Sequence, residues 1–491
     1  MSKRNSPDRP NAAFSSGAFP ADAAAAEAVL GWYKAASRDF VRGNATAAVR
    51  AARRGLTIDP GHAVLAALEA LAQQRRGDPA AAHRGSCRAL VLAPGHAGSW
   101  QLRGGMAHLL GRSQDSLGSS RRALLLDPRD TAAAHNLFTA ERERGDWPSA
   151  VAAGRRNRVL DPGAAAGAVD LGMLLLGLGR WAEGWPLYDR RLHLATARPH
   201  PGRLPQPYWT GTPDSGLGLA VWCDQNVGDE MQFAQLLPEV AGRVGRVVLE
   251  CDPRLMPLFA RSFPAIEVVP RVDPPDPRLL APDIGAQIPQ GHLGGLLRRD
   301  AASFARGPAR WLVADPDRAE ALRRRYQAWS EGRPVIGVAW RSSNAGFRGK
   351  NLPLERWGPV LRQDGALFLS VQYGDVADDL AAAQAATGVA VAHDPEIDAL
   401  ADLDGFAALL AATDLVISIS NSTIHQACGL GRPVWGLLHV RPDWRWGVAG
   451  RSCPWFPSLT LYRQAERGAW GPVLEAVRRD LRGWLADRRA C

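Results

Sequence analysis

The hydrophobic pattern of the first two hundred residues repeats with a step of 34. Similar apolar phrases, among them GLTIDPGH and ALLLDPRD, each end in a proline at Pro60, Pro94, Pro128 and Pro162. Glycines keep the same step at Gly43, Gly77, Gly111, Gly145 and Gly179, and a small residue follows five positions later at Ala48, Ala82, Ser116 and Ala150. Glycine permits a tight turn between two helices, the small residue lets them approach, and proline stops the second helix. The pattern predicts stacked helix pairs at 29–62, 63–96, 97–130, 131–164 and from 165 to about 198.

A different pattern follows these repeats. Residues 199–217 are dense in proline and glycine and predict a linker. Beyond them, short apolar runs alternate with helical stretches, which indicates parallel βαβ units. We expect strands in a first lobe at 219–224, 246–251 and 266–270, and in a second lobe at 334–340, 366–371, 389–393, 415–420 and 433–438. The amphipathic stretch 469–487 predicts a C-terminal helix that can cross back over the first lobe.

Composition and charge narrow the function classes. The net charge of +10 comes almost entirely from arginine, and no basic run with interleaved aromatic residues indicates nucleic-acid binding. No stretch approaches the roughly 20 apolar residues of a membrane span, and the N-terminus lacks the apolar core of a secretory signal. Six scattered cysteines without a CxxC pair predict buried free thiols in a reducing compartment. We therefore expect a cytoplasmic protein.

Ligands of such sheets bind beyond the carboxyl ends of the strands, so the loops there are the candidate sites. After 219–224, the segment QNVGDEMQF places Gln225, Gly228 and Asp229 at the start of a helix. Asp229 can serve there as an N-cap, or it can face a cleft and act as a general base on an acceptor hydroxyl. After 334–340, a polar loop contains Arg348 and Lys350, of which Lys350 is the one lysine of the C-terminal half. A compact ammonium in a chain otherwise committed to arginine favours phosphate contact over a merely solvated loop.

Two further loops follow strands of the second lobe. The strand 415–420 leads into Asn421, Ser422 and Thr423, where a helix begins, with His425 in its first turn. Helix N-termini attract anions such as a diphosphate, although simple capping is the alternative. The loop 439–458 gathers Arg441, Asp443, Trp444, Arg445, Trp446 and Trp455. Aromatic planes and guanidinium groups suit sugar or base recognition, and interlobe packing is the competing interpretation. The chain has no GxxxxGK[ST], HExxH or GxSxG motif.

These segments carry a resemblance to known families. The repeats resemble tetratricopeptide repeats, and about 219–480 resembles the GT-B glycosyltransferases of the heptosyltransferase type, in the branch fused to such repeats in bacteria. The resemblance is carried by NVGDEMQFAQLLPEV, IGVAWRSSNAGFRGKNLPLERWGPVL, FLSVQYGD, DLVISISNSTIHQACGLGRPVWGLL and PDWRWGVAGRSCPWFPSLTLYRQ. Relatives often have Asp-Thr where this chain has Asn421-Ser422-Thr423, and the segment 282–297 departs from the usual phrase on the acceptor side.

The resemblance implies an α-solenoid followed by two doubly wound Rossmann-like lobes. The parts would be a tail (1–28), the repeat array (29–198), a linker (199–217), an acceptor lobe (218–330) and a donor lobe with a C-terminal helix (331–491). It implies that Gly228 and Asp229 form the family's glycine–aspartate pair, with Asp229 as the catalytic base. It also implies that the nucleotide-sugar donor is held by Ser422, Thr423 and His425, by Arg348 or Lys350, and by Gln372. From the chemistry of the loops we add Asn421 to the donor contacts, and we expect Gln225, Gly228, Arg441, Trp444 and Trp446 to contact the acceptor or the sugar.

The expected function is sugar transfer to a hydroxyl of a protein recruited by the repeats, with a flagellin-type surface protein as one candidate. No metal or cofactor is expected beyond the nucleotide-sugar co-substrate, and a homodimer is left open. Two alternatives stand beside it. One is transfer to lipopolysaccharide or another glycan, and the other is a catalytically silent repeat scaffold.

Overall fold

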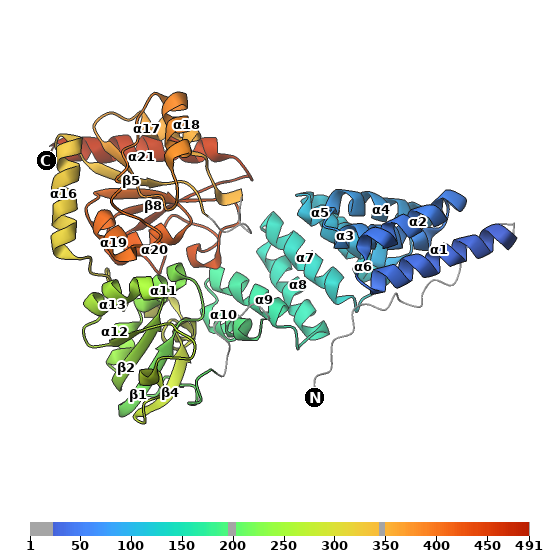
Figure 1. Cartoon of the computed structure of the whole chain (residues 1–491), viewed down its shortest axis with the longest axis horizontal. Coiled ribbons are helices and arrows are strands. Elements are labelled where there is room, and N and C mark those ends of the chain that lie inside the picture. The colour runs from blue at the N-terminus through green and yellow to red at the C-terminus, as the bar shows by residue number, and fades with distance from the viewer. Residues whose placement is uncertain (1–22, 195–202, 343–348, 491) are drawn as a thin grey trace. The chain divides into compact units, whose positions relative to one another are not determined.

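The computed structural model describes residues 23–194, 203–342 and 349–490, and its contacts divide the chain into two compact units that meet at Ala168 and Val169. The first unit is a helical repeat solenoid (Figure 1). Its antiparallel pairs are α1 (Ala23–Val41) with α2 (Ala45–Ile58), α3 (Ala63–Arg75) with α4 (Pro79–Leu92), α5 (Ala97–Leu109) with α6 (Ser113–Leu126), and α7 (Thr131–Arg144) with α8 (Trp147–Leu160). Helix α1 begins inside the stretch predicted as a tail.

The turns of the repeats follow the predicted chemistry. The five glycines spaced by 34 residues all adopt positive φ, between 72° and 80°. The small residues that follow them, Ala48, Ala82, Ser116 and Ala150, are fully buried where the paired helices meet. Glycine is favoured in this left-handed conformation because it has no Cβ. The helix-pair prediction is confirmed.

The helices of the fifth pair belong by their contacts to the second unit from Val169 onward. They are α9 (Ala165–Gly177) and α10 (Trp181–Tyr188), and the 3-10 turn η1 (Asp189–His193) follows them. Trp185 of α10 is buried in the same hydrophobic core as Leu219, Phe233 and Trp455 of the second unit. The linker at 199–217 stays a prediction, although the first strand already begins inside it, at Asp214.

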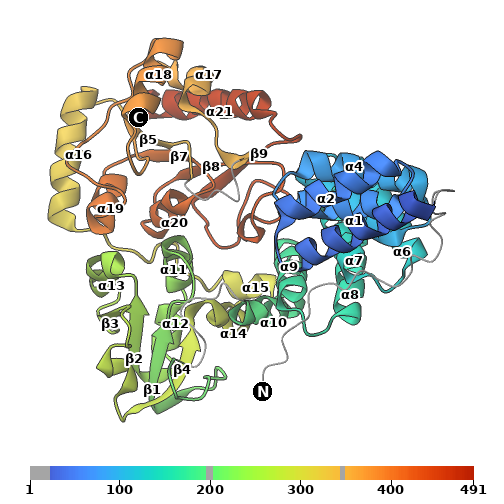
Figure 2. The ribbon, with the colours of Figure 1, turned by 45° about the vertical axis from the view of Figure 1, so that its right-hand side comes forward.

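Two wholly parallel sheets form the rest of the second unit (Figure 2). The first has the order β3-β2-β1-β4, with β1 (Asp214–Trp222), β2 (Val244–Cys251), β3 (Glu267–Pro270) and β4 (Ile284–Pro289). The second has the order β6-β5-β7-β8-β9, with β5 (Val335–Ala339), β6 (Leu367–Ser370), β7 (Leu415–Ile419), β8 (Val434–Leu438) and β9 (Leu459–Arg463). The α/β part with parallel sheets is therefore as predicted.

Helices lie between these strands in the chain, and the last helix follows β9. They are α11 (Val227–Ala234), α12 (Leu237–Ala241), α13 (Met256–Ser262), α14 (Leu293–Leu297), α15 (Ala301–Phe304), α16 (Pro316–Ser330), α17 (Gly358–Leu361), α18 (Ala377–Thr387), α19 (Leu403–Ala411), α20 (Ser422–Gly429) and α21 (Trp470–Ala490). Right-handed crossovers of this kind cover the faces of parallel sheets and leave the carboxyl ends of the strands for ligands.

Three details differ from the sequence predictions. The predicted strand 389–393 forms only an isolated bridge, between Ala392 and Leu369. The edge strands β4 and β9 were not predicted, because Gly285 and Gln287 interrupt the apolar run of β4 and Thr460 that of β9. Helix α21 does not cross to the first sheet: its residues Val473, Val477 and Leu481 share a core with strands β5, β7 and β8 of the second sheet.

The described ranges also bear on membrane insertion and on cysteine pairing. Among those residues, none of the helices combines the length and the apolar character that crossing a bilayer requires. The five described cysteines are free, and all but Cys87 are buried.

Candidate functional site

The first turns of α11 and α20 meet beyond the carboxyl ends of β1 and β7 (Figure 2). Gly228 makes the closest approach: a Cβ built there would lie 3.2 Å from Cδ2 of His425 and 3.6 Å from Cα of Ser422. A side chain at position 228 would hold the helices apart, so the glycine is what permits the contact. The structure thus brings together two loops that the sequence singled out separately, 225–233 and 420–425.

Asp229 lies at this junction in a double role. Its Oδ2 accepts a hydrogen bond of 3.3 Å from the Asn226 backbone amide, as part of a capping box at the start of α11. Its Oδ1 forms an ion pair with Arg445. The Arg445 guanidinium also pairs with Asp443, at 2.6 Å, and lies over the Trp444 ring, with Cζ 4.7 Å from the centroid. The capping interpretation is therefore confirmed, and the role of Asp229 as a general base stays a prediction.

Burial shapes the electrostatics of this pair. The side chains of Asp229 and Arg445 are only 16% and 10% exposed. Burial raises the pKa of Asp229, while Arg445 opposes that rise. Burial also disfavours the charge of Arg445, but Asp229 and Asp443 together hold its pKa above the usual range. The carboxylate is thus easier to protonate than an exposed aspartate, and its arginine stays charged.

Lys350 and His425 lie near the same charges. Burial lowers the pKa of Lys350, and Asp443 opposes this effect. Burial and then the cations Arg445 and Lys350 hold the pKa of His425 well below its ordinary value, so the imidazole is neutral at pH 7. Its ring stacks on Trp446 at 5.2 Å. Arg348, the other predicted basic group of this loop, lies outside the described residues.

Two residues predicted to contact the donor are engaged with the chain itself. Gln372 Oε1 accepts hydrogen bonds from the backbone amides of Trp340 and Arg341, at 3.0 and 2.9 Å. Asn421 accepts from the Thr423 amide at 3.0 Å and donates to the Arg341 carbonyl at 3.3 Å. Both side chains therefore fix the chain directly after β5, where the loop containing Lys350 begins.

The remaining predicted residues form the walls of the junction. Gln225 accepts a 2.7 Å hydrogen bond from the hydroxyl of Tyr188, whose ring meets that of Trp444 at 5.3 Å. Trp446 is buried and donates to Ser420 Oγ at 2.9 Å. Thr423 is fully buried behind the first turn of α20. Arg441 donates to the neighbouring Val440 carbonyl at 2.8 Å.

Several polar atoms at this junction have hydrogen-bonding capacity that the described chain does not use. They are buried and lack a partner among the described residues: Nδ1 of His425, Oγ1 of Thr423, Nε of Arg445, Nε1 of Trp444 and Nε2 of Gln225. Buried polar groups are nearly always hydrogen-bonded in folded proteins, and exceptions tend to mark functional sites or bound ligands. Such a concentration is the pattern expected of a binding site.

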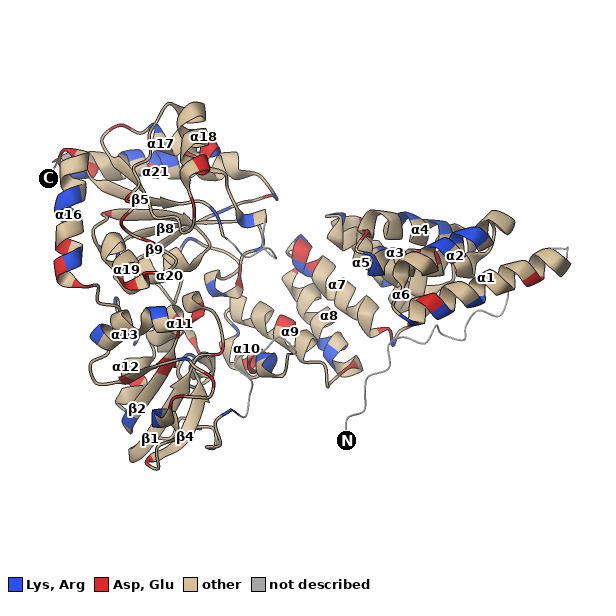
Figure 3. Cartoon of the chain, in the orientation of Figure 1, with Lys and Arg blue, Asp and Glu red and all other residues tan. Residues whose placement is uncertain are grey.

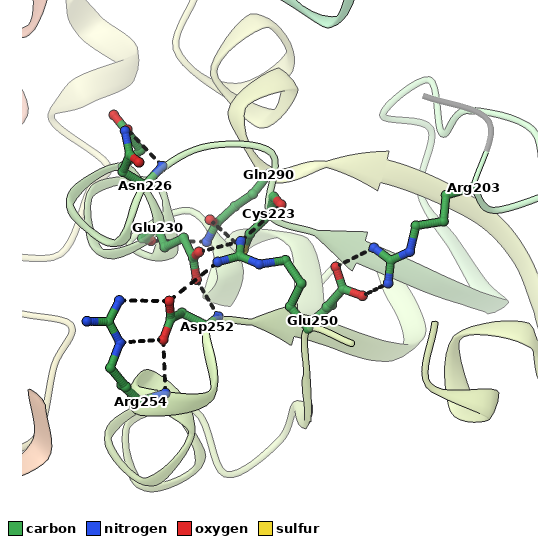
Figure 4. A network of polar contacts seen from close by, with 10 residues as sticks. Arg203, Cys223, Asn226, Glu230, Glu250, Asp252, Arg254 and Gln290 are labelled. Atoms are coloured by element: carbon green, nitrogen blue, oxygen red, sulfur yellow. Dashed lines mark hydrogen bonds and ion pairs between the residues drawn. The ribbon is translucent and has the colours of Figure 1, made fainter. Parts of the chain in front are cut away.

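A second polar network holds α11 in place from the side of the first sheet (Figure 4). The buried Glu230 pairs with Arg271 at 2.7 Å and accepts from the Asp252 amide at 2.9 Å. Gln290 donates to the Glu230 carbonyl at 3.2 Å and accepts from the Cys223 thiol at 3.2 Å. Glu230, the residue adjacent to Asp229, is thus anchored to the ends of β1, β2 and β4. The first sheet therefore fixes the position of Asp229 through its neighbour.

Sequence reasoning missed the residues contributed by the end of the helical region. Tyr188 and the buried Arg191, which pairs with Asp224 at 2.7 Å, were assigned to the last repeat, and nothing local in the sequence places them beside β1. Arg445 was noticed in its loop but not as the partner of Asp229, 216 residues away. A separate cavity of about 230 Å³ lies beside α10 and is not lined by the predicted site residues; its lining residues are Ala182, Trp185, Pro186, Asp189, Tyr208, Trp209, Ile288, His292, Gly295, Leu296 and Arg299.

Among the described residues, no group of three or more His, Cys, Asp or Glu side chains is arranged to hold a metal ion.

Comparison with known proteins gives one substantial sequence relative. No family model matches the chain. The chain is 32% identical over 389 residues to Protein FlbA of Caulobacter vibrioides (strain ATCC 19089 / CIP 103742 / CB 15), which covers 74% of this chain and 63% of FlbA. The chain therefore spans less than two thirds of the length of this relative.

Two solved structures that resemble the chain each align with about a third of it. The crystal structure of MamA aligns with 34% of this chain and 91% of its own, at a TM-score of 0.32 and 18% identity. PilF of Pseudomonas aeruginosa aligns with 34% of this chain and 76% of its own, at a TM-score of 0.32 and 21% identity. The repeat architecture itself rests on the helix pairs described above, which are of the tetratricopeptide-like kind that binds peptides and proteins.

Proposed function

We propose that the second unit is a glycosyltransferase of the GT-B type, which moves a sugar from a nucleotide-sugar donor to a hydroxyl of a protein bound by the repeats. The observation that carries the proposal is the junction of α11 and α20. Two helix N-termini, a buried carboxylate, two cations and several unpartnered polar atoms converge there. A nucleotide diphosphate or monophosphate is an anion suited to such a place.

On the donor side, the phosphates lie at the first turn of α20. Ser422 and Lys350 contact them directly, and Arg348 is a further candidate from the same loop. Gln372 and Asn421 act as positioning residues, because their side chains hold the backbone of Arg341 at the root of that loop. The neutral His425, stacked on Trp446, supplies Nδ1 as a hydrogen-bonding atom without adding charge.

On the acceptor side, Asp229 acts as the general base. The acceptor oxygen forms its bond to the anomeric carbon as its proton passes to the Asp229 carboxylate, and the nucleotide leaves with the electron pair of the broken bond. Lys350, Arg445 and the N-terminal amides of α20 stabilise the charge that develops on the leaving group. Gln225, Gly228, Arg441, Trp444 and Trp446 are the proposed contacts of the acceptor or the sugar.

The acceptor is proposed to be a protein, because the first unit is a repeat solenoid of a kind that binds polypeptides. A flagellin-type surface protein is the candidate suggested by the resemblance of the sequence. The solenoid itself contributes no catalytic group to this scheme, since all the proposed reacting side chains lie in the second unit.

Calorimetric titration with a panel of nucleotides and nucleotide sugars tests the proposal. One or more of them should bind the full-length chain, and Lys350→Ala should weaken that binding by about 1.5–3 kcal/mol, the range for a hydrogen bond to a charged group. Lys34→Ala is the matched control, since Lys34 is exposed on α1 of the repeat unit. Absence of binding across the panel, or equal affinity of the Lys350→Ala variant, would contradict the donor site.

A further inference from the structure

Exposed aliphatic side chains recur at one position of successive repeats. Val91, Leu125 and Val159 are 34 residues apart, lie in the last turns of α4, α6 and α8, and are 84%, 74% and 78% exposed. Isolated exposed aliphatic residues are common on protein surfaces and need no explanation. Because stacked repeats place equivalent positions side by side, these three form a row instead.

The row continues one position later in three of the second helices. Ile58, Leu92 and Leu126, at the ends of α2, α4 and α6, are also partly exposed. We call these six residues the aliphatic strip: Ile58, Val91, Leu92, Leu125, Leu126 and Val159.

The fold does not require the aliphatic strip. The residues that pack the same helix ends into the core are Leu56, Leu90 and Leu124, which are 5–7% exposed. In α2 the position equivalent to Val91 is an exposed threonine, Thr57, so a polar residue is accepted there. A row of aliphatic side chains kept in solvent without a packing role indicates an interaction surface.

The same helices are basic on balance. The second helices of the four pairs, α2, α4, α6 and α8, contain ten arginines and one carboxylate, that of Asp115, and their capping residues add five aspartates, Asp59, Asp78, Asp127, Asp146 and Asp161. Figure 3 shows the basic residues along α2 and α4. Arg53 and Arg121 pair with carboxylates of the neighbouring first helices, Glu69 and Glu141, while both arginines stay more than half exposed. The resulting positive potential favours a negatively charged partner.

We propose that the aliphatic strip and the arginines of α2, α4, α6 and α8 form a docking surface for an acidic segment of a partner protein. The segment would place carboxylates against the arginines and aliphatic side chains against the strip. This inference does not rest on the proposed sugar transfer.

Other occupants fit this surface less well. A second copy of the chain would bring ten arginines against ten, which like-charge repulsion opposes. An interfacial membrane helix buries an apolar face of Trp, Phe or Leu that runs along the helix, whereas the aliphatic strip occupies only the last turns of separate helices. Bases of single-stranded nucleic acids stack on aromatic rings. The aliphatic strip consists of valine, leucine and isoleucine only.

Peptide selection on the full-length chain tests the inference. A displayed library of random peptides of roughly 20 residues, which at ~3.3 Å per residue can extend past several repeats, is selected on the wild-type chain. Counter-selection uses the triple variant Val91→Glu, Leu125→Glu, Val159→Glu. These side chains are exposed, so the variant should keep its helical signal and unfolding midpoint. Enrichment of sequences that combine Asp or Glu with spaced Leu, Ile or Val is the expected result.

The enriched peptides are then titrated against the variants. Binding should weaken at least about tenfold in the triple variant, as expected from losing aliphatic burial, and should weaken with added salt. It should persist in Leu109→Glu, since Leu109 is also largely exposed, at 65%, at the end of α5 but outside the strip. No enrichment, neutral enriched peptides, or equal binding by the triple variant would overturn the proposal. So would strip-dependent binding to phosphatidylglycerol vesicles, to single-stranded RNA or to a second copy in place of peptides.

Discussion

At the scale of single residues, the pairing of Asp229 with Arg445 sets the behaviour of the site. The carboxylate is held at one oxygen by the guanidinium and at the other by the Asn226 amide. If Asp229 is the proposed base, it is already oriented and must exchange one of these contacts for the acceptor hydroxyl. In the proposed reaction, an anionic donor beside Arg445 would be a competing partner for the guanidinium.

Asp229→Asn is the direct test of the proposed base. The amide keeps the shape of the side chain but cannot accept the proton, so transfer should fall by about 10²-fold or more, the usual contribution of a positioned base. Donor affinity measured by calorimetry should change little. Asp443→Asn is the matched control, because it removes the other carboxylate partner of Arg445 while leaving the base in place. If Asp229→Asn is fully active, a group other than Asp229 takes the proton of the acceptor hydroxyl.

The raised pKa of Asp229 predicts a pH dependence. Only the ionised carboxylate can take a proton, so kcat/KM should fall as the pH drops through the Asp229 pKa. Burial raises that pKa, so the acidic limb should lie above the value of ~3.9 for an ordinary aspartate. Arg445→Gln removes the group that opposes the rise, and the limb should move to still higher pH. If the acidic limb does not move in Arg445→Gln, the titrating group is not the carboxylate that Arg445 contacts.

At the scale of elements, the contact between α11 and α20 depends on one glycine. In Gly228→Ala the new methyl would meet the ring of His425, which is buried and stacked on Trp446 and therefore cannot yield easily. We expect a cost of about 1–3 kcal/mol in the free energy of unfolding, together with weaker nucleotide binding. Gly118→Ala is the control: it lies in α6 with nothing within 4 Å, and it should stabilise the chain by about 0.5–1 kcal/mol. A Gly228→Ala variant as stable as the wild type would refute the close contact.

Most elements could be predicted because their signals are local. The glycines at 34-residue spacing each specify a turn by their own backbone preference, and buried strands such as β7 are continuous apolar runs. The carboxyl-end rule for parallel sheets likewise pointed to Asp229 and to the turn at 421–425 before their contact was known. The edge strands β4 and β9 could not be predicted, because polar or small residues interrupt their apolar sequences.

The pairings within the site could not be predicted in the same way. The ion pair of Asp229 and Arg445 joins residues 216 positions apart, and the hydrogen bond of Tyr188 to Gln225 joins the helical region to the end of β1. Such contacts follow from how the two sheets and α10 pack, which no local pattern encodes. Local sequence also could not show that Gln372 and Asn421 form hydrogen bonds with backbone amides at 340–341 and 423.

At the scale of the whole molecule, α10 is joined to the second unit by a buried tryptophan. The Trp185 indole donates to the Arg298 carbonyl at 2.7 Å, and its ring meets Trp444 at 5.5 Å and Trp455 at 6.1 Å, edge to face in both cases. Gly294 leaves room for the same ring. The last helices of the repeat pattern are thereby part of the core that supports the candidate site.

Two truncations should therefore differ in stability. A fragment of residues 163–491 retains α9 and α10, whereas a fragment of 205–491 begins after the predicted array and loses Trp185. Removing a buried tryptophan alone typically costs about 3–5 kcal/mol, so the shorter fragment should unfold at lower urea concentration and expose apolar surface. Urea titration followed by circular dichroism compares the two, and 163–491 should show one cooperative transition. Nucleotide binding should survive in 163–491 and weaken in 205–491, because Trp185 and Tyr188 back the loop that carries Arg445. If the two fragments have equal stability and equal nucleotide affinity, α9 and α10 belong to the repeat array, and the domain boundary lies at 199–217.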